Sequence, residues 1–144
     1  MLKNLRFWIL FIIFWANAIL GFGFNFYRFF WFDQVLHFLG GLGVYIFLYP
    51  YFRNDLAGLL WIKKTILLVG ASVMVGVIWE FAEYSTTAIP AILNLPWDGY
   101  TFIGDLPDTL EDLTLDTLGA LSGSIIYLLH SFRQRKTEQV QSPF

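Results

Sequence analysis

The sequence predicts an all-α protein, a polytopic membrane bundle of about four transmembrane helices with both chain ends in the cytoplasm. Hydrophobic residues make up 57% of the 144 residues, whereas charged residues make up only 14%. A soluble domain carries about 25% charged residues. Aromatic residues, which are counted among the hydrophobic ones, make up 20% of the chain, and this is more aromatic surface than a water-soluble fold of this length can bury. The mean hydropathy of +0.60 agrees with a membrane protein.

Four apolar segments are long enough to cross a membrane. A transmembrane helix needs about 20 mainly apolar residues to span about 30 Å of hydrocarbon. The four segments lie at residues 7–24, 34–52, 65–86 and 113–132. A loop rich in Pro, Trp and Asp is expected at residues 87–112. We therefore expect one transmembrane helical domain over residues 1–132 and a cytoplasmic basic tail over residues 133–144.

The first apolar segment has two interpretations. It follows Lys3 and Arg6 and contains Ala16-Asn17-Ala18, a pattern typical of signal-peptide cleavage sites. However, the apolar run continues past this tripeptide to Phe24. A retained first helix is therefore the expectation.

Basic residues predict the orientation. Eight of the nine Lys and Arg residues fall in the N-terminal segment, the connection after the second span and the C-terminal segment. The remaining one, Arg28, lies on the other side. Because cytoplasmic loops carry an excess of Lys and Arg, both termini are expected in the cytoplasm, and the chain is expected to be a multi-pass protein of the inner or plasma membrane.

Small residues recur on three of the spans. Gly40, Gly41 and Gly43 lie in the second span. The third contains Gly76, and the fourth contains Gly119 and Gly123 in a G-x-x-x-G pattern. Such residues let helix backbones approach closely within a membrane, so helix contact is their expected role.

Acidic residues dominate one part of the chain. Between Thr65 and Phe132 there is no Lys or Arg, but there are eight acids. They are Glu80, Glu83, Asp98, Asp105, Asp108, Glu111, Asp112 and Asp116. All lie towards the extracytoplasmic ends of the third and fourth spans or in the loop that joins them.

Helical spacing groups these acids with one histidine. Glu80 and Glu83 are three residues apart, and Asp33 and His37 are four apart at the start of the second span. If residues 105–116 are helical, the aspartates there also share one stripe. We expect one polar pocket near the outer leaflet, formed by His37, Glu80, Glu83, Asp112 and Asp116. The additional candidates are Asp33, Asp105 and Asp108.

This pocket needs a neutralising cation. A buried carboxylate must be paired, protonated or bound to a metal, and Arg28 and His37 are the only nearby basic groups. The sequence therefore predicts a divalent metal ion, protons or a cationic ligand. Carboxylates with one imidazole suit Mg²⁺, Mn²⁺ or Ca²⁺, with Zn²⁺ open through His37. Thiolate ligands are excluded because the chain has no cysteine.

Several of these acids also have a purely structural interpretation. Asp105 suits the N-cap of the fourth helix, with Asp108 as its capping-box partner. Asp98, in a Pro-Trp-Asp-Gly sequence, suits a turn. His130 lies at the cytoplasmic end of the fourth span and is assigned no role.

Three blocks together resemble a known family. They are FDQVLHF from residue 32, WEFAEY from residue 79, and GDLPDT from residue 104 with DTLGA from residue 116. In these blocks the chain is similar to the small YjdF-like integral membrane proteins and, more distantly, to the VanZ-like family associated with teicoplanin resistance. The resemblance covers roughly residues 33–123 and implies site residues rather than a reaction. Relatives often carry a basic residue where this chain has Gln34.

Three functions fit this pattern. The first is an acidic, metal-binding site near the outer leaflet that acts on a lipid-linked or cell-envelope substrate by metal-assisted hydrolysis or transfer. The second is a proton- or cation-coupled transporter. The third is a non-catalytic subunit of a membrane complex. Membrane lipids are the expected partners, with a homo-oligomer or a membrane partner left open. Nucleic acid is excluded, since a net charge of −2 provides no basic face.

Overall fold

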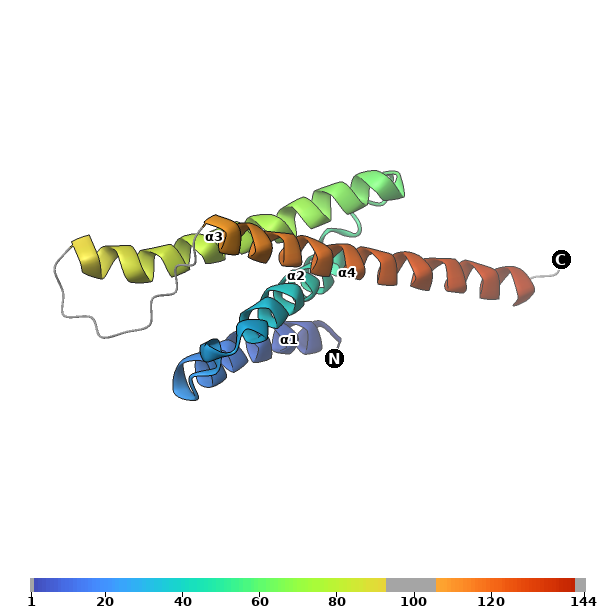
Figure 1. The fold of residues 1–144 in the computed structure, drawn as a ribbon. Helices are drawn as coiled ribbons and strands as arrows, with labels where there is room; N and C mark the ends of the chain where they lie inside the picture. The colour runs from blue at the N-terminus through green and yellow to red at the C-terminus, as the bar shows by residue number, and fades with distance from the viewer. Residues whose placement is uncertain (1, 93–105, 142–144) are drawn as a thin grey trace.

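The computed structural model describes residues 2–92 and 106–141, and all the elements in these ranges are helical (Figure 1). They are α1 (Leu2–Ala16), η1 (Asn17–Gly23), η2 (Phe26–Arg28), α2 (Phe30–Phe52), α3 (Trp61–Ile92) and α4 (Leu106–Gln141). Three segments are long and apolar enough to cross a membrane: Phe30–Phe52, Trp61–Ser85 and Leu106–Gln134. The predicted all-α, multi-pass membrane architecture is confirmed.

The first predicted span differs from the other three. Its apolar helix, Leu5–Gly21, is shorter, and α1 passes directly into the π-helical η1. The backbone N–H of Phe24 donates to the carbonyl of Ile19, five residues earlier, which is the π-helical pattern. The chain then reverses at Asn25, whose φ of 57° is left-handed, a conformation that Asn tolerates.

The loop predicted at residues 87–112 is wrong at both ends. Helix α3 continues to Ile92, and α4 begins at Leu106. Asp108 therefore lies in the first turn of α4, and Asp112 follows one turn later. Negative side chains stabilise a helix N-terminus, so acids that suggested a polar loop instead begin the helix. At its other end α4 continues to Gln141, within the range 133–144 predicted as a cytoplasmic tail.

Glycines bring α2 and α4 into backbone contact. A Cβ at Gly41 would overlap the backbone of Asp116, and one at Gly119 would overlap the backbone of Phe38. Gly43 instead faces Leu10 and other side chains of α1. The predicted role of these glycines in helix contact is therefore correct, and α2 lies at the centre of the bundle, between α1 and α4 (Figure 1).

The helices alternate in direction along the chain. In Figure 1 the start of α1, the turn from α2 to α3 and the described end of α4 lie towards one end of the molecule. The reversal from α1 to α2 lies at the other end. The structure thus places at one end the three segments that carry eight of the nine basic residues.

The half of the bundle near that basic end has a packed core. Tyr45, Leu68 and Ala120 are almost fully buried there. The ring of Tyr49 stacks on that of Tyr127, with centroids 3.9 Å apart. This core fixes the helices that carry the polar side chains of the opposite half.

Candidate functional site

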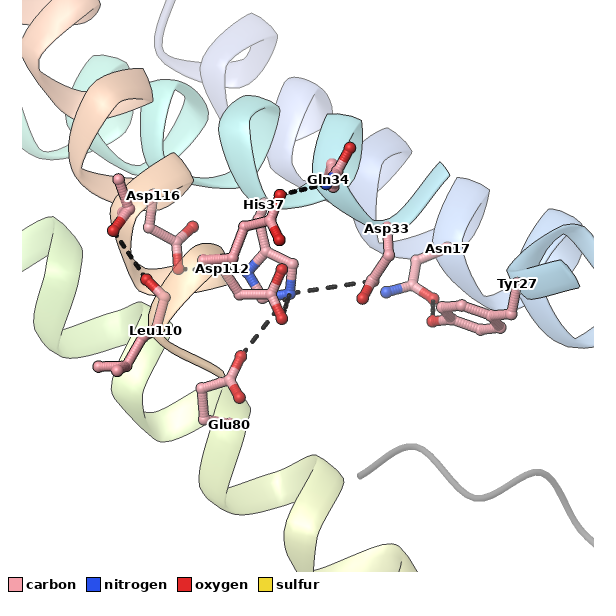
Figure 2. A network of polar contacts seen from close by, with 11 residues as sticks. Asn17, Tyr27, Asp33, Gln34, His37, Glu80, Leu110, Asp112 and Asp116 are labelled. Atoms are coloured by element: carbon pink, nitrogen blue, oxygen red, sulfur yellow. Dashed lines mark hydrogen bonds and ion pairs between the residues drawn. The ribbon is translucent and has the colours of Figure 1, made fainter. Parts of the chain in front are cut away.

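Three helices bring six acidic and imidazole side chains together. We call this group the acid–histidine cluster; it consists of Asp33 and His37 from α2, Glu80 and Glu83 from α3, and Asp112 and Asp116 from α4. Figure 2 shows His37 at the centre of the cluster. His37, Asp112 and Asp116 are buried, whereas Asp33, Glu80 and Glu83 are partly exposed.

The Nε2 atom of His37 faces three carboxylates. It lies 3.7 Å from Oε1 of Glu80, 3.9 Å from Oδ1 of Asp33 and 3.9 Å from Oδ2 of Asp112. These separations exceed the usual N–H···O range of about 2.7–3.2 Å. Nε2 of His37, Oδ1 of Asp33 and Oε1 of Glu80 are accordingly buried without a hydrogen-bond partner among the described residues.

The other imidazole nitrogen is held by Asp116. Nδ1 of His37 lies 3.3 Å from Oδ2 of Asp116 and is in position to donate a hydrogen bond to that carboxylate. This contact favours the tautomer with the proton on Nδ1, which leaves the Nε2 lone pair directed at the three carboxylates. A histidine oriented by a carboxylate on one nitrogen and open on the other has the usual arrangement of a metal ligand.

Glycines make room for the Asp116 side chain. A Cβ at Gly76 of α3 would overlap its carboxylate, and one at Gly40 of α2 would lie 3.7 Å from Oδ1. The carboxylate that orients His37 therefore fits against α3 only because that helix has a glycine at position 76, whereas a Cβ at Gly40 would make an ordinary contact.

Other sequence-predicted residues take different positions. Two sets of three side chains have ligand atoms that all lie within 4.8 Å of one another. One set is His37, Glu80 and Asp112, and the other is Asp33, His37 and Glu83. Asp108 lies one turn before Asp112, close enough to repel the carboxylates of Asp33 and Asp112. Asp105 and Asp98 lie outside the described residues.

The sequence did not identify Asn17 and Tyr27 as residues near the cluster. The Tyr27 hydroxyl donates to Oδ1 of Asn17, which is buried in the π-helical segment. Burial raises the pKa of Tyr27 above its ordinary value, and the nearby carboxylates of Asp33 and Glu83 raise it further. The phenol therefore stays neutral beside the cluster. Their contact could not be found from the sequence, because the π-helical turn that directs Asn17 inwards has no clear sequence pattern.

Gln34 and Arg28 do not neutralise the cluster. The side-chain amide of Gln34 donates to Oε1 of Glu111, linking α2 to α4 beside the cluster. The guanidinium of Arg28 lies over the ring of Phe29, with its Cζ 4.6 Å from the ring centroid. Among the described residues, the ion pairs found for Asp33, Glu80, Asp112 and Asp116 are all with His37.

An apolar cavity of about 260 Å³ adjoins the cluster between α1, α2 and α3. His37 and Asp116 form one part of its wall, and Asn17 and Ser72 are among its other polar lining residues. The apolar wall is mainly formed by Leu10, Ile13, Phe14, Val44, Val75 and Trp79. The cavity is therefore lined mainly by apolar side chains and borders the acid–histidine cluster at His37 and Asp116.

Sequence comparison identifies a membrane-protein family. Residues 2–133 match the family model described as predicted membrane protein (DUF2238). The chain belongs to the DUF2238 family. It is also 33% identical over 120 residues to a Thermotoga maritima protein described as "Uncharacterized protein", an alignment that covers 77% of this chain and 56% of that relative. The chain thus spans little more than half the length of this relative. No solved structure matches the chain.

Membership of DUF2238 supports a membrane protein and agrees with the predicted location. The more specific resemblance to YjdF-like and VanZ-like proteins stays a prediction. In this DUF2238 chain the acid–histidine cluster contains imidazole and carboxylate groups that are close enough together to bind a metal ion.

Proposed function

We propose that the acid–histidine cluster binds one divalent metal ion near the outer leaflet and that the protein acts there on a lipid-linked or cell-envelope substrate. The observation that carries this proposal is Nε2 of His37, buried, without a hydrogen-bond partner and surrounded by carboxylates of three helices. An ion between these atoms would satisfy Nε2 and the two unpartnered carboxylate oxygens of Asp33 and Glu80 at once.

The spacing of the donor atoms supports a shared ion. Two ligands of a tetrahedral Zn²⁺, with bonds of about 2.0–2.2 Å, lie about 3.3–3.6 Å apart. The bonds to Ca²⁺, at about 2.3–2.6 Å, allow wider spacing. The observed 3.7–3.9 Å around Nε2 needs a contraction of only a few tenths of an ångström. Mn²⁺ and Mg²⁺ also suit a donor set of carboxylates with one imidazole.

The balance of charge in the cluster favours a bound cation over neutralisation of the carboxylates by His37 alone. Asp33, Glu80, Asp112 and Asp116 all lie within 4 Å of a single imidazole, so even a protonated His37 sets one positive charge against four carboxylates. An ionised acid near the bilayer centre costs about 2.5–3.5 kcal/mol on insertion scales. A divalent ion offsets this repulsion with two charges placed at the centre of the cluster.

The neighbouring cavity supports a lipid substrate. Its apolar wall is suited to a hydrocarbon chain, and its polar wall contains His37 and Asp116. A divalent ion held by the cluster would supply a Lewis acid for a phosphoryl or acyl oxygen. Glu83, which is partly exposed beside Asp33 and His37, is placed to act as a general base. Metal-assisted hydrolysis or transfer is the reaction class that fits these groups.

The opposite half of the bundle favours this function over transport. There the hydroxyls of Thr65 and Ser124 bond to each other at 2.8 Å. Between the two halves, the Ser72 hydroxyl, which lines the apolar cavity, donates to the carbonyl of Leu68. A relay needs polar groups that are free to exchange partners, whereas these described groups are paired locally.

Metal analysis of the purified protein tests the centre. After reconstitution with Mg²⁺, Mn²⁺, Ca²⁺ or Zn²⁺ and removal of free ions, we expect about one equivalent in the wild type and almost none in Glu80→Gln or His37→Gln. His130→Gln is the matched control because His130 is exposed near the basic end. A wild type that retains none of the four ions, or Glu80→Gln with full occupancy, contradicts the proposed centre.

A cavity-filling variant tests the substrate class separately. Val44→Phe should fill the apolar cavity and reduce the lipid retained by the purified protein in native mass spectrometry, while metal stoichiometry stays unchanged. Val35→Phe is the control, since Val35 is exposed on the same helix and does not line the cavity. Equal lipid retention in the wild type and both variants would remove the support for a lipid substrate but leave the metal centre intact.

A further inference from the structure

A second pocket lies at the basic end of the bundle, away from the acid–histidine cluster. It has a volume of about 260 Å³ and is formed by residues that are distant in sequence. Arg6 comes from α1, Tyr49 and Pro50 from the end of α2, and Arg53 follows α2 directly. Helix α4 supplies Tyr127, His130, Ser131 and Gln134. We call this the basic pocket.

The lining of the basic pocket is rich in cationic groups and hydrogen-bond donors. Arg6 and Arg53 contribute two guanidinium groups, and His130 contributes an imidazole. The described lining contains no carboxylate, and no ion pair to a described acidic side chain is found for Arg6 or Arg53. Two positive charges therefore face one pocket without an internal counter-charge in the described chain.

Neutral donors complete the lining. The stacked rings of Tyr49 and Tyr127 form one part of its wall and carry two hydroxyl groups. Ser131 adds a third hydroxyl, and the Gln134 amide lies 2.9 Å from Nε2 of His130. Planar guanidinium groups bind phosphate oxygens in pairs, and hydroxyl and amide donors satisfy the remaining oxygens. This combination suits a tetrahedral anion with several oxygens.

The location of the pocket agrees with a ligand at the membrane interface. Orientation from basic residues predicts that this end faces the cytoplasm, where anionic headgroups attract basic groups. We propose that the basic pocket binds a phosphate group, carried by an anionic lipid headgroup of the inner leaflet or free in the cytoplasm. This site is independent of the proposed metal centre, because none of its residues belongs to the acid–histidine cluster.

Titration of the full-length protein in a neutral detergent tests the proposal and distinguishes the two sources. Thermal stability is measured against phosphatidylglycerol, against diacylglycerol as the matched lipid without phosphate, and against inorganic phosphate at constant ionic strength. Stabilisation by phosphatidylglycerol but not by diacylglycerol or inorganic phosphate assigns the site to a lipid headgroup. Stabilisation by inorganic phosphate alone assigns it to the soluble anion. Both results support a phosphate site.

Charge-matched variants locate the binding. In Arg6→Gln/Arg53→Gln we expect the affinity for the stabilising phosphate compound to fall by about 25-fold, from about fivefold for each basic group near an anionic surface. Lys63→Gln/Lys64→Gln removes two charges at the same end without altering the pocket lining, and its affinity should stay within about twofold of the wild type.

Two outcomes overturn the proposal: no phosphate compound stabilises the wild type, or both double variants lose affinity equally. If the arginine double variant does not fold, Gln134→Glu replaces it, because this change keeps the side-chain length and places a negative charge in the pocket. Unchanged affinity in Gln134→Glu would also contradict a phosphate site there.

Discussion

The two halves of this bundle treat buried polar groups in opposite ways. Near the basic end, the buried hydroxyls of Thr65 and Ser124 bond to each other, so they are satisfied within the protein. In the acid–histidine cluster, buried atoms of Asp33, His37 and Glu80 have no hydrogen-bond partner in the described chain. The same three helices form both halves. Stability therefore explains the first arrangement, whereas the second is the basis of the proposed metal centre.

The largest expected effect concerns which side of the membrane each half faces. A green fluorescent protein fused to the C-terminus should fluoresce and an alkaline phosphatase fused there should be inactive, because the end with most basic residues remains in the cytoplasm. The response is close to all-or-none. An active phosphatase at the C-terminus would place the cluster at the cytoplasmic leaflet and reverse the comparison.

Gly41→Ala should damage both halves together. Its new Cβ would lie about where the backbone of Asp116 now lies, with Cα of Asp116 only 2.8 Å away. Backbone atoms cannot move aside as a flexible side chain can, so α2 and α4 must separate. We expect a loss of about 3 kcal/mol or more, at the upper end of overpacking effects, measured as reduced thermal stability and a smaller folded fraction.

Gly70→Ala is the matched control for this substitution. Gly70 lies within α3, and a Cβ there would meet nothing within 4 Å. Alanine favours a helix over glycine by up to about 1 kcal/mol, so the thermal stability should stay the same or rise. Equal destabilisation by both alanines would show that the α2–α4 contact is not the close approach described above.

Asp116→Asn should affect the cluster alone. The amide fits between Gly40 and Gly76 as the carboxylate does, but it lacks the charge that favours a proton on Nδ1 of His37. Loss of a partner that orients a metal ligand lowers metal affinity by about 10–100-fold. Isothermal titration with Mn²⁺ or Zn²⁺ measures this change. Unchanged affinity in a folded Asp116→Asn protein would show that His37 does not act as an oriented ligand.

The sequence predicted those features that depend on local spacing. Apolar length located the three long spans, and spacings of three and four residues grouped Asp33 with His37 and Glu80 with Glu83. Helix ends were less predictable: apolar length began the fourth span at residue 113, whereas α4 begins at Leu106, directly after the position that the capping pattern suggested as its N-cap. Contacts between elements could not be predicted. The bond from Gln34 to Glu111 depends on the rotation of α2 against α4, and that from Tyr27 to Asn17 depends on a π-helical turn.

Thr65→Val should affect the opposite half alone. The variant keeps the shape of the side chain but leaves the buried hydroxyl of Ser124 without the partner it has at 2.8 Å. A buried polar group left unsatisfied costs about 1–3 kcal/mol. Thermal stability should fall by an amount in this range, while metal affinity at the cluster stays unchanged. A parallel loss of metal binding would show that the two halves are coupled rather than independent.

The smallest expected effect is at Gln34, where relatives suggested by the sequence resemblance often carry a basic residue. Gln34 donates to Glu111 at the partly exposed edge of the cluster. Gln34→Lys replaces this bond by an ion pair worth about 0.2–1 kcal/mol and adds one positive charge near the carboxylates. Stability should therefore rise slightly, and divalent-ion affinity should fall less than in Asp116→Asn, because the ammonium repels the ion without removing a ligand. Gln34→Met has a similar length but no donor, so it separates the loss of the bond to Glu111 from the effect of the added charge. Its stability should fall slightly, and its metal affinity should stay unchanged. If Gln34→Lys is instead less stable than Gln34→Met, the carboxylates are already neutralised. A positive charge added at this position then does not stabilise the folded protein.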